Sequence, residues 1–158
     1  MFCLGFTLCI LLHVELNNED MNNAIYSLHR PKNEPLLSYA PGTPERSELE
    51  KELKRLSSET IEIPLIINGK PVRTGQTGKV VLPHNHGHVL ATYHMAGEKE
   101  SGEAIKAGLE ARESWMALSW IERASVMLKV AELLSKKYRH TIVAATMLGQ
   151  SKSAQQAE

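Results

Sequence analysis

Apolar positions recur at helical spacing in the stretch TPERSELEKELKRL. Leu49, Leu53 and Leu56 lie three or four residues apart, so they share one face of a helix. Thr43 is a good N-cap, and Pro44 fits the first helical position, where its missing N–H is not needed. Acidic residues early in the stretch and basic residues late in it complement the helix dipole. The pattern predicts a helix that ends at the sequence SSET.

The spacing then changes to that of short strands. The stretch IEIPLIINGKPVRTG is rich in β-branched residues, and its Asn68-Gly69 dipeptide suits a two-residue hairpin turn. We predict two short antiparallel strands around this turn. Pro64 and Pro71 each lack a backbone donor, which favours the edge of a sheet. A second strand pair, KVVLP with GHVLATYHM, is predicted around a histidine-rich bend.

Helical spacing returns at Ala96 and continues to the last residue. The stretch EKESGEAIKAGLEARESWMAL predicts a first helix, one side of which is mostly small and would allow a close neighbour. That side consists of Ala104, Ala107, Gly108, Ala111 and Trp115. Ser119 and Glu122, in capping-box spacing, predict the start of a second helix, which we expect to bury a broad apolar stripe. That stripe consists of Ala124, Met127, Leu128, Ala131 and Leu134.

Two further helices are predicted at the end of the chain. RHTIVAATMLG is expected to stop at Gly149, and Ser151 to begin SKSAQQAE. This last helix has roughly two turns and reaches Glu158 without a Gly, a Pro or a basic last turn. A helix that short is unstable without packing, and the chain lacks the uninterrupted apolar strands of a parallel sheet. We therefore expect the sequence to be part of a larger protein.

The first residues, MFCLGFTLCILLHV, form an apolar run shorter than the roughly twenty residues of a membrane helix. No Lys or Arg precedes the run, unlike in a signal peptide, and no arginine occurs before Arg30, unlike in a mitochondrial presequence. We expect an atypical leader, with a secretory signal as the alternative. Residues 17–42, rich in Asn, Pro and Ser, predict a loosely ordered lead-in.

Composition leaves few candidates for chemistry. The chain has 18 basic and 18 acidic residues, so no basic face indicates nucleic-acid binding. Cys3 and Cys9 both lie in the leader, and Asp20 is the one aspartate, which argues against Cys–His and Ser–His–Asp nucleophiles. GKPVRTGQTGK lacks the phosphate-loop pattern and no G-x-G-x-x-G occurs. GQSKS at 149–153 could favour an anion, but a C-cap followed by an N-cap explains it better.

Four of the seven histidines lie within one short stretch, PHNHGHVLATYH. They are His84, His86, His88 and His94. On a strand the first three would project from one face, as metal ligands do. No cysteine is near, and His84 and His88 are too widely spaced to share an ion without a bend at Gly87. We favour solvent-facing or hydrogen-bonding histidines over a metal site, and a metal-binding domain is the alternative.

Five stretches carry a family resemblance. They are NEPLLSYAPGTPERSELEKEL (33–53), IPLIINGKPVRTG (63–75), PHNHGHVLATYHMA (83–96), AIKAGLEARESWMALSWIERASVMLKVAELLS (104–135) and AATMLGQSKSAQQAE (144–158). In this order they resemble the amino-terminal part of the delta-1-pyrroline-5-carboxylate dehydrogenases, a branch of the aldehyde dehydrogenase superfamily. NEPLLSYAPGTPER and PHNHGH point to this branch in particular, whereas residues 1–30 do not resemble it.

The resemblance implies NAD-dependent oxidation of L-glutamate γ-semialdehyde to L-glutamate in proline breakdown, usually in the mitochondrial matrix. It implies a homodimer with a Rossmann-like NAD domain, a catalytic domain and a small β-arm. In the family a cysteine thiolate attacks the aldehyde, a glutamate activates water, and an asparagine stabilises the oxyanion. No residue here matches these groups or the helix that holds the NAD pyrophosphate. We therefore predict no catalytic, cofactor-binding or metal-binding residue in this chain.

The expected fold class is the amino-terminal portion of an α/β aldehyde dehydrogenase fold, without its parallel sheet. It should comprise a lead-in helix, edge hairpins and three to four further helices. We expect residues 1–32 to be the leader, 33–59 the lead-in segment and helix, and 60–158 the start of the NAD-binding domain. The chain should be inactive alone, with neither nucleic acid nor membrane as a partner. The alternative is a non-catalytic module or short isoform that docks on full-length subunits.

Overall fold

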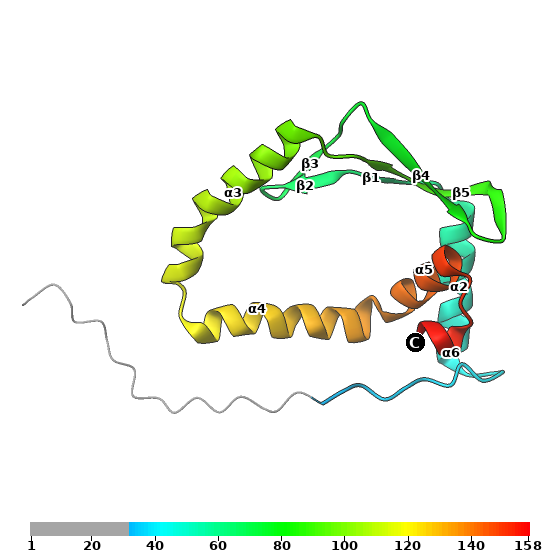
Figure 1. Cartoon of the computed structure of the whole chain (residues 1–158). Coiled ribbons are helices and arrows are strands. Elements are labelled where there is room, and N and C mark those ends of the chain that lie inside the picture. The colour runs from blue at the N-terminus through cyan, green and yellow to red at the C-terminus, as the bar shows by residue number, and fades with distance from the viewer. Residues whose placement is uncertain (1–31) are drawn as a thin grey trace, which may run out of the picture. The chain divides into compact units, whose positions relative to one another are not determined.

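A computed structural model describes residues 32–158. Within it, residues 34–158 form one compact unit of helices and short strands (Figure 1). The expectations for the apolar leader and its two cysteines lie outside the described residues. No helix between residues 32 and 158 combines the length and apolar character that a membrane span requires.

Helix α2 runs from Pro44 to Ser58, as the leucine spacing predicts. Leu49 and Leu56 are buried on one face of it. Thr43 precedes the helix in an extended conformation, but its hydroxyl donates to the carbonyl of Ala40 (2.9 Å) and does not cap the helix. The boundary prediction is therefore confirmed, whereas the side-chain cap is absent at this helix start.

Both predicted hairpins are present. Strands β2 (Leu65–Ile67) and β3 (Lys70–Val72) pair antiparallel in a two-stranded sheet. Asn68 and Gly69 join them with φ angles of 51° and 70°, the positive values that the dipeptide was expected to supply. Strands β4 (Thr77–Leu82) and β5 (Asn85–His94) form the second antiparallel pair.

A third pairing was not predicted. Strand β1 (Ile61–Ile63) runs parallel to β5, with Ile61 opposite Ala91, so the larger sheet has the order β1-β5-β4 (Figure 1). Pro64 follows β1 directly and offers no N–H, so the chain leaves this sheet before it enters β2. Parallel pairing joins strands far apart in sequence, and no turn motif announces it.

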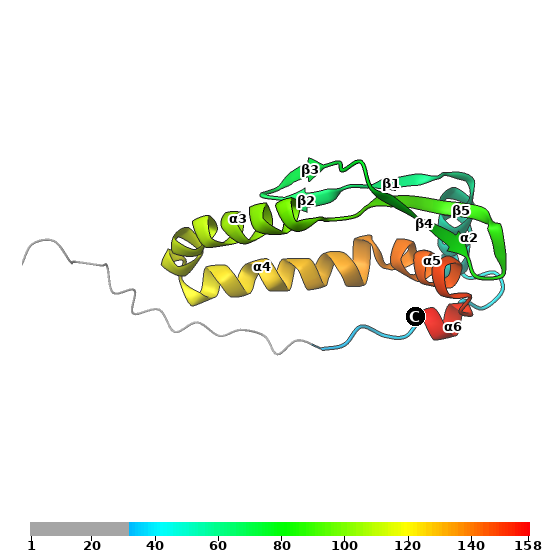
Figure 2. The same ribbon diagram turned by 45° about the horizontal axis from the view of Figure 1, so that its top comes forward.

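Helix α3 runs from Glu98 to Ala117 and lies beside β2, as Figure 2 shows. Its small side chains face the hairpin, as predicted, and together they line a cavity of about 240 Å³. The residues around this cavity are Ile66, Ile67, Asn68, Ala104, Ala107, Gly108 and Ala111. The small residues thus allow the helix to approach the strand closely.

Helix α4 (Trp120–Glu132) continues through a π-helical turn, η1 (Leu133–Lys137), into α5 (Arg139–Gln150). The predicted capping box opens α4, because Ser119 Oγ accepts from the Glu122 N–H (3.3 Å) and the Glu122 carboxylate accepts from the Ser119 N–H (2.8 Å). This prediction is confirmed.

The predicted end of α5 at Gly149 is wrong. The helix continues to Gln150, and Ser151 takes the left-handed conformation, with a φ of 52°. The Ser151 hydroxyl also lies 3.0 Å from His84 Nδ1, a contact that accompanies this turn. Ser153 then caps the short helix α6 (Ala154–Ala157). The GQSKS stretch is thus a C-cap followed by an N-cap, displaced from the predicted residues.

The predicted burial of the α4 stripe is also wrong. Met127, Leu128 and Leu134 are 59%, 44% and 50% exposed. The apolar spacing identifies the face of a helix that avoids water, but it does not say whether the same chain supplies the atoms that cover it. In residues 32–158 this face remains open to solvent.

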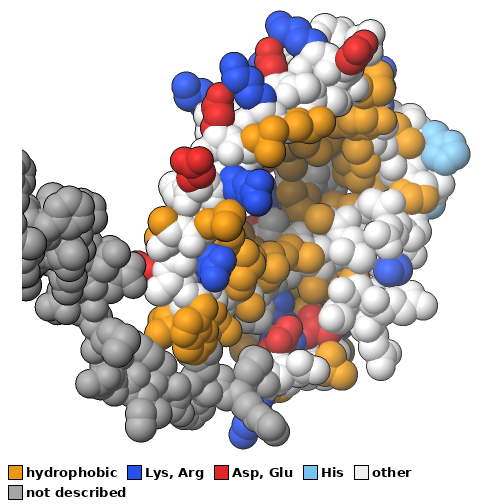
Figure 3. All heavy atoms as spheres, turned by 60° about the vertical axis from the view of Figure 1, so that its left-hand side comes forward, with side chains coloured by type: hydrophobic (Ala, Val, Ile, Leu, Met, Phe, Trp, Pro, Cys, Tyr) orange, Lys and Arg blue, Asp and Glu red, His pale blue; other side chains and the backbone are white. Residues whose placement is uncertain are grey.

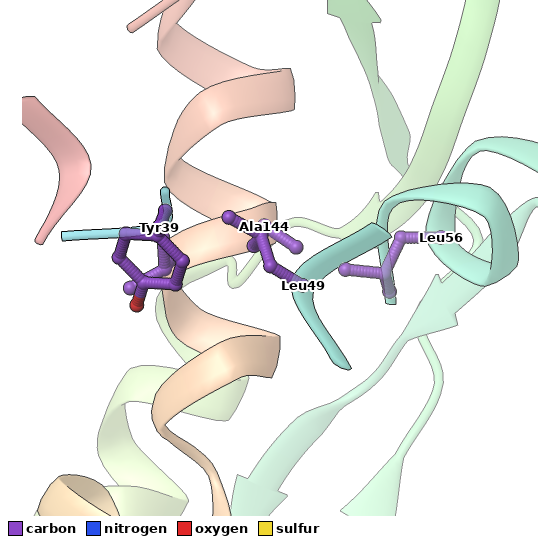
Figure 4. Close-up of a cluster of buried hydrophobic side chains, with 5 residues drawn as sticks. Tyr39, Leu49, Leu56 and Ala144 are labelled. Carbon is purple, nitrogen blue, oxygen red and sulfur yellow. The ribbon is translucent and has the colours of Figure 1, made fainter. Parts of the chain in front are cut away.

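The buried core lies between α2 and α5. Leu49 and Leu56 of α2 pack beside Val143 and Ala144 of α5, with Tyr39 of the lead-in segment in the same cluster (Figure 4). Ala144 is completely buried, and its small side chain allows α2 to approach. This packing fixes the lead-in segment, α2 and α5 as one block.

Candidate functional site

The carboxylate of Glu158 is the centre of the most enclosed polar cluster that the structure describes. Only 3% of its side chain is exposed. Arg139 Nη2 donates to Oε1, the Tyr39 hydroxyl donates to Oε2 (2.7 Å), and the Leu37 backbone N–H donates to Oε1 (3.1 Å). Arg139 Nη2 also donates to the Pro35 carbonyl (2.6 Å). The cluster therefore ties the lead-in segment to α5 and to the end of the chain.

These contacts set the protonation states of the cluster. Burial by itself would raise the pKa of Glu158, but the bonds from Arg139, Tyr39 and Leu37 together outweigh it and lower that pKa. The pKa of Tyr39 is strongly raised, first by burial and then by its bond to the Glu158 carboxylate. Glu158 therefore stays ionised and Tyr39 stays protonated at neutral pH.

A cavity of about 400 Å³ opens beside this cluster. Its charged lining includes Arg139 and Glu158, which neutralise each other, and Glu34. The rest of the lining is mostly apolar. It consists of Ala131, Leu134, Ser135, Ile142, Val143 and Ala157. Because both oxygens of Glu158 already accept hydrogen bonds, the carboxylate serves this arrangement as a structural tie and not as a general base.

A second cluster surrounds His94 at the end of β5. Its Nε2 lies 3.0 Å from Glu62 Oε1, and its Nδ1 lies 2.7 Å from the Thr74 carbonyl oxygen and 2.9 Å from the Thr74 nitrogen. Arg73 Nε donates to the other oxygen of Glu62 (3.0 Å). The bonds from Arg73 and His94 lower the pKa of Glu62, with His94 the larger cause. His94 thus connects β1 to the segment that follows β3.

The other three clustered histidines do not join His94. His84 lies in the exposed turn before β5 and contacts Ser151, and His86 is exposed on β5. Among residues 32–158 no three His, Cys, Asp or Glu side chains lie close enough to hold a metal ion. Two of the four histidines therefore have hydrogen-bonding roles, at two separate places.

Large apolar side chains gather on the side where α3 and α4 meet. Figure 3 shows them around a hollow in this face. Those on α3 include Ile105, Leu109 and Met116, which are 66%, 63% and 59% exposed. Patches of this kind on a soluble protein usually mark an interface.

Comparison with known proteins then decides the family. The model of the aldehyde dehydrogenase family matches residues 72–158. The chain belongs to the aldehyde dehydrogenase family. The match covers β3 to β5 and all helices from α3 onward, including the Glu158 cluster's two helical partners.

Relatives in this family share a name. Delta-1-pyrroline-5-carboxylate dehydrogenase of Agaricus bisporus is 43% identical over 136 residues, which is 85% of this chain and 25% of that protein. The human enzyme of that name, called mitochondrial, is 40% identical over 126 residues, or 80% of this chain and 22% of that protein. The chain thus spans about a quarter of the length of the curated relatives it matches.

A solved structure extends the similarity to the backbone. Delta-pyrroline-5-carboxylate dehydrogenase from Mycobacterium tuberculosis, solved with bound NAD, superposes with a TM-score of 0.82 at 42% identity. The superposition covers 86% of this chain and 26% of that one. The expected fold class, an amino-terminal portion of an aldehyde dehydrogenase fold, is confirmed.

The described residues of this aldehyde dehydrogenase chain do not fit an NAD pyrophosphate. Such a group binds at a helix N-terminus with free backbone donors. At the start of α3 the Glu100 carboxylate already accepts from the Gly97 N–H (2.8 Å), and at α4 Glu122 occupies the same place. Glu98 adds a further negative charge to the first turn of α3. We derive no cofactor chemistry from these residues.

Sequence reasoning did not identify the two polar clusters. Glu158 and Tyr39 are 119 positions apart, and His94 and Glu62 are 32 apart. No spacing rule connects residues so distant, and His94 was grouped with its neighbours in sequence. The phenol of Tyr39 and the guanidinium of Arg139 carried no motif that could have identified them.

Proposed function

We propose that this chain serves the NAD-dependent oxidation of L-glutamate γ-semialdehyde to L-glutamate, a step of proline breakdown. The observation that carries this proposal is the superposition on the M. tuberculosis enzyme, at 42% identity over 86% of the chain. Relatives at 43% and 40% identity carry the name of the same activity. Identity at this level, spread over several elements, supports a shared substrate more strongly than a shared fold alone.

Within that reaction we assign the chain a structural role. Residues 60–158 would form the start of the NAD-binding domain and residues 33–59 its lead-in segment, with residues 1–32 outside both. The chain carries no match to the family's nucleophilic cysteine, general base or oxyanion asparagine, so it should not turn over substrate by itself. Homodimers, the mitochondrial matrix and NAD are the assembly, location and cofactor that follow from this assignment.

A chimera tests the shared substrate. Residues 34–158 replace the matching segment of the M. tuberculosis enzyme, and NADH formation is measured with pyrroline-5-carboxylate. We expect turnover within about tenfold of the parent enzyme, because the exchanged part carries framework and no reacting group. A chimera that folds and binds NAD but does not oxidise pyrroline-5-carboxylate would contradict the proposal.

The isolated chain gives the complementary measurement. The same assay with the 158-residue protein alone should show no NADH formation above the rate without protein. Turnover by the chain alone would refute the structural role, whatever the chimera does.

A second function is favoured by the open apolar face of α3 and α4. A non-catalytic module that docks on other dehydrogenase subunits would need such a surface, and Met127 and Ile105 are 59% and 66% exposed there. Co-purification of the tagged chain with an intact dehydrogenase subunit would support this function. Recovery of the chain without the subunit would leave the structural role as the better assignment.

A further inference from the structure

Helix α3 has two apolar sides with different fates. Its small residues face β2, whereas Ile105, Leu109 and Met116 are 66%, 63% and 59% exposed. These three large residues are four and seven positions apart, so they form one stripe along the helix. The stripe takes no part in the contact with the hairpin, and its burial requires atoms from elsewhere.

Helix α4 carries a matching stripe. Met127, Val130 and Leu134 are 59%, 46% and 50% exposed and are three and four positions apart. Polar residues occupy other sides of this helix, for example Ser125, which lies about 160° around the axis from Met127. The helix is thus amphipathic, but its apolar side faces solvent.

The α4 stripe leads into the cavity of about 400 Å³ beside Glu158. Leu134 and Ile142 belong to both, because each lines the cavity and is at least 42% exposed. The charges of Arg139 and Glu158 satisfy each other, so they present no unpaired charge to an incoming group. The lining therefore suits apolar side chains and not a charged segment.

The relatives indicate what covers these stripes. The M. tuberculosis enzyme has the same backbone over 86% of this chain, yet the match takes up only 26% of that enzyme, which leaves 74% (100 − 26) of its chain outside. A chain with the same framework therefore has ample further residues to bury the two stripes. An intact subunit already contains its own copy of this region, so its equivalent surface is occupied.

We propose that the α3 and α4 stripes, with the adjoining cavity, are a docking surface for the complementary segment of a pyrroline-5-carboxylate dehydrogenase, and that the segment binds in trans. The partner is the part of the enzyme outside the match, supplied as a separate chain, and the contact is apolar. This inference rests on the proposed function, because it takes the occupant from the enzymes that share the fold.

The test uses the full 158-residue chain and the part of the M. tuberculosis enzyme that follows the matched segment. Binding is measured by size exclusion with light scattering and by calorimetry. We expect a one-to-one complex, and we expect Met127→Lys/Leu134→Lys to weaken it by at least about tenfold, because each lysine brings a charge into an apolar contact. The matched control, Ser125→Lys, adds the same charge on the opposite side of α4 and should bind within about twofold of the parent.

Folding of the variants does not limit the test. Met127 and Leu134 are about half exposed already, so their replacement leaves the core of α2 and α5 intact, which circular dichroism checks. Ile105→Lys on α3 provides an independent second variant with the same expected loss. Normal binding by both the α4 double variant and the α3 variant would overturn the proposal.

Three other results would also overturn it. They are no complex with the parent chain, equal affinity for the intact enzyme, and self-association of the chain that Met127→Lys/Leu134→Lys abolishes while the complementary segment has no effect. The chimera assay separates this proposal from the proposed function. An active chimera without docking in trans refutes the docking surface alone, whereas docking with an inactive chimera refutes the reaction alone.

Discussion

Replacing Glu158 by alanine should destabilise the fold more than the loss of any exposed carboxylate. In the parent chain Arg139, the Tyr39 hydroxyl and the Leu37 N–H all donate to this one side chain. The substitution removes the shared acceptor and leaves the guanidinium, with 14% of its side chain exposed, without its carboxylate. The loss therefore combines three missing bonds with an uncompensated, nearly buried charge.

The expected magnitude follows from this geometry. Removing one partner of a buried ion pair costs about 3–5 kcal/mol. Arg139 keeps its bond to the Pro35 carbonyl, which retains part of its stabilisation and places the estimate near the lower end, at about 3 kcal/mol. The lead-in segment should also lose its attachment to α5, because Leu37 and Tyr39 lose their common acceptor.

Urea unfolding followed by circular dichroism measures this change. The matched control is Glu50→Ala, which removes the same group from an exposed i,i+4 pair with Arg46 and should change the free energy of unfolding by less than about 0.5 kcal/mol. Arg139→Met, alone and combined with Glu158→Ala, completes a double-mutant cycle. We expect a coupling energy above about 1.5 kcal/mol.

Equal losses for Glu158→Ala and Glu50→Ala would refute this reasoning, because the enclosed carboxylate would then contribute no more than a surface one. A coupling energy near zero in the cycle would refute the assignment to Arg139 in particular.

Three further predictions concern the core, the acid limb and the hairpin. Leu49→Ala should lower the free energy of unfolding by about 2–5 kcal/mol because Leu49 is 3% exposed, while Leu109→Ala at an exposed site should change it by less than about 0.5 kcal/mol; urea titration measures both, and equal losses would contradict the described core. The folded-state pKa of Glu158 is lowered, so its stabilisation is complete above the ordinary glutamate pKa of about 4.3 and is lost as the pH falls through the lowered value. Glu158→Gln should therefore lose less stability than the parent on acidification, and parallel pH profiles would argue against this. Gly69→Ala should destabilise by about 1 kcal/mol because its φ is 70°, whereas Gly75→Ala, where φ is not positive, should be neutral in thermal unfolding.

Local rules predicted the elements of this chain well. Leucine spacing and Pro44 determine where α2 begins, Asn68-Gly69 determines its hairpin, and Ser119 with Glu122 determines the start of α4. Each of these signals lies within a few neighbouring residues, where backbone conformation and side-chain capping are decided.

Long-range features were beyond the same rules. The parallel pairing of β1 with β5 and the bonds to Glu158 join residues that no turn or helix period relates. The end of α5 was missed by two residues because Ser151, and not Gly149, adopts the left-handed conformation. The exposure of Met127 was missed for another reason, since an apolar face can be recognised without any knowledge of what covers it.

The tie between Tyr39 and Glu158 also has a consequence for synthesis. The two residues are 119 positions apart, and a ribosome adds about 5–20 residues per second, so Glu158 is added about 6–24 s after Tyr39. Throughout that interval α2 has neither α5 to pack against nor the carboxylate that anchors the segment before it. The first folded helix of the chain must therefore wait, with Leu49 and Leu56 uncovered, for residues made last, and this interval is when a nascent chain would most need a chaperone.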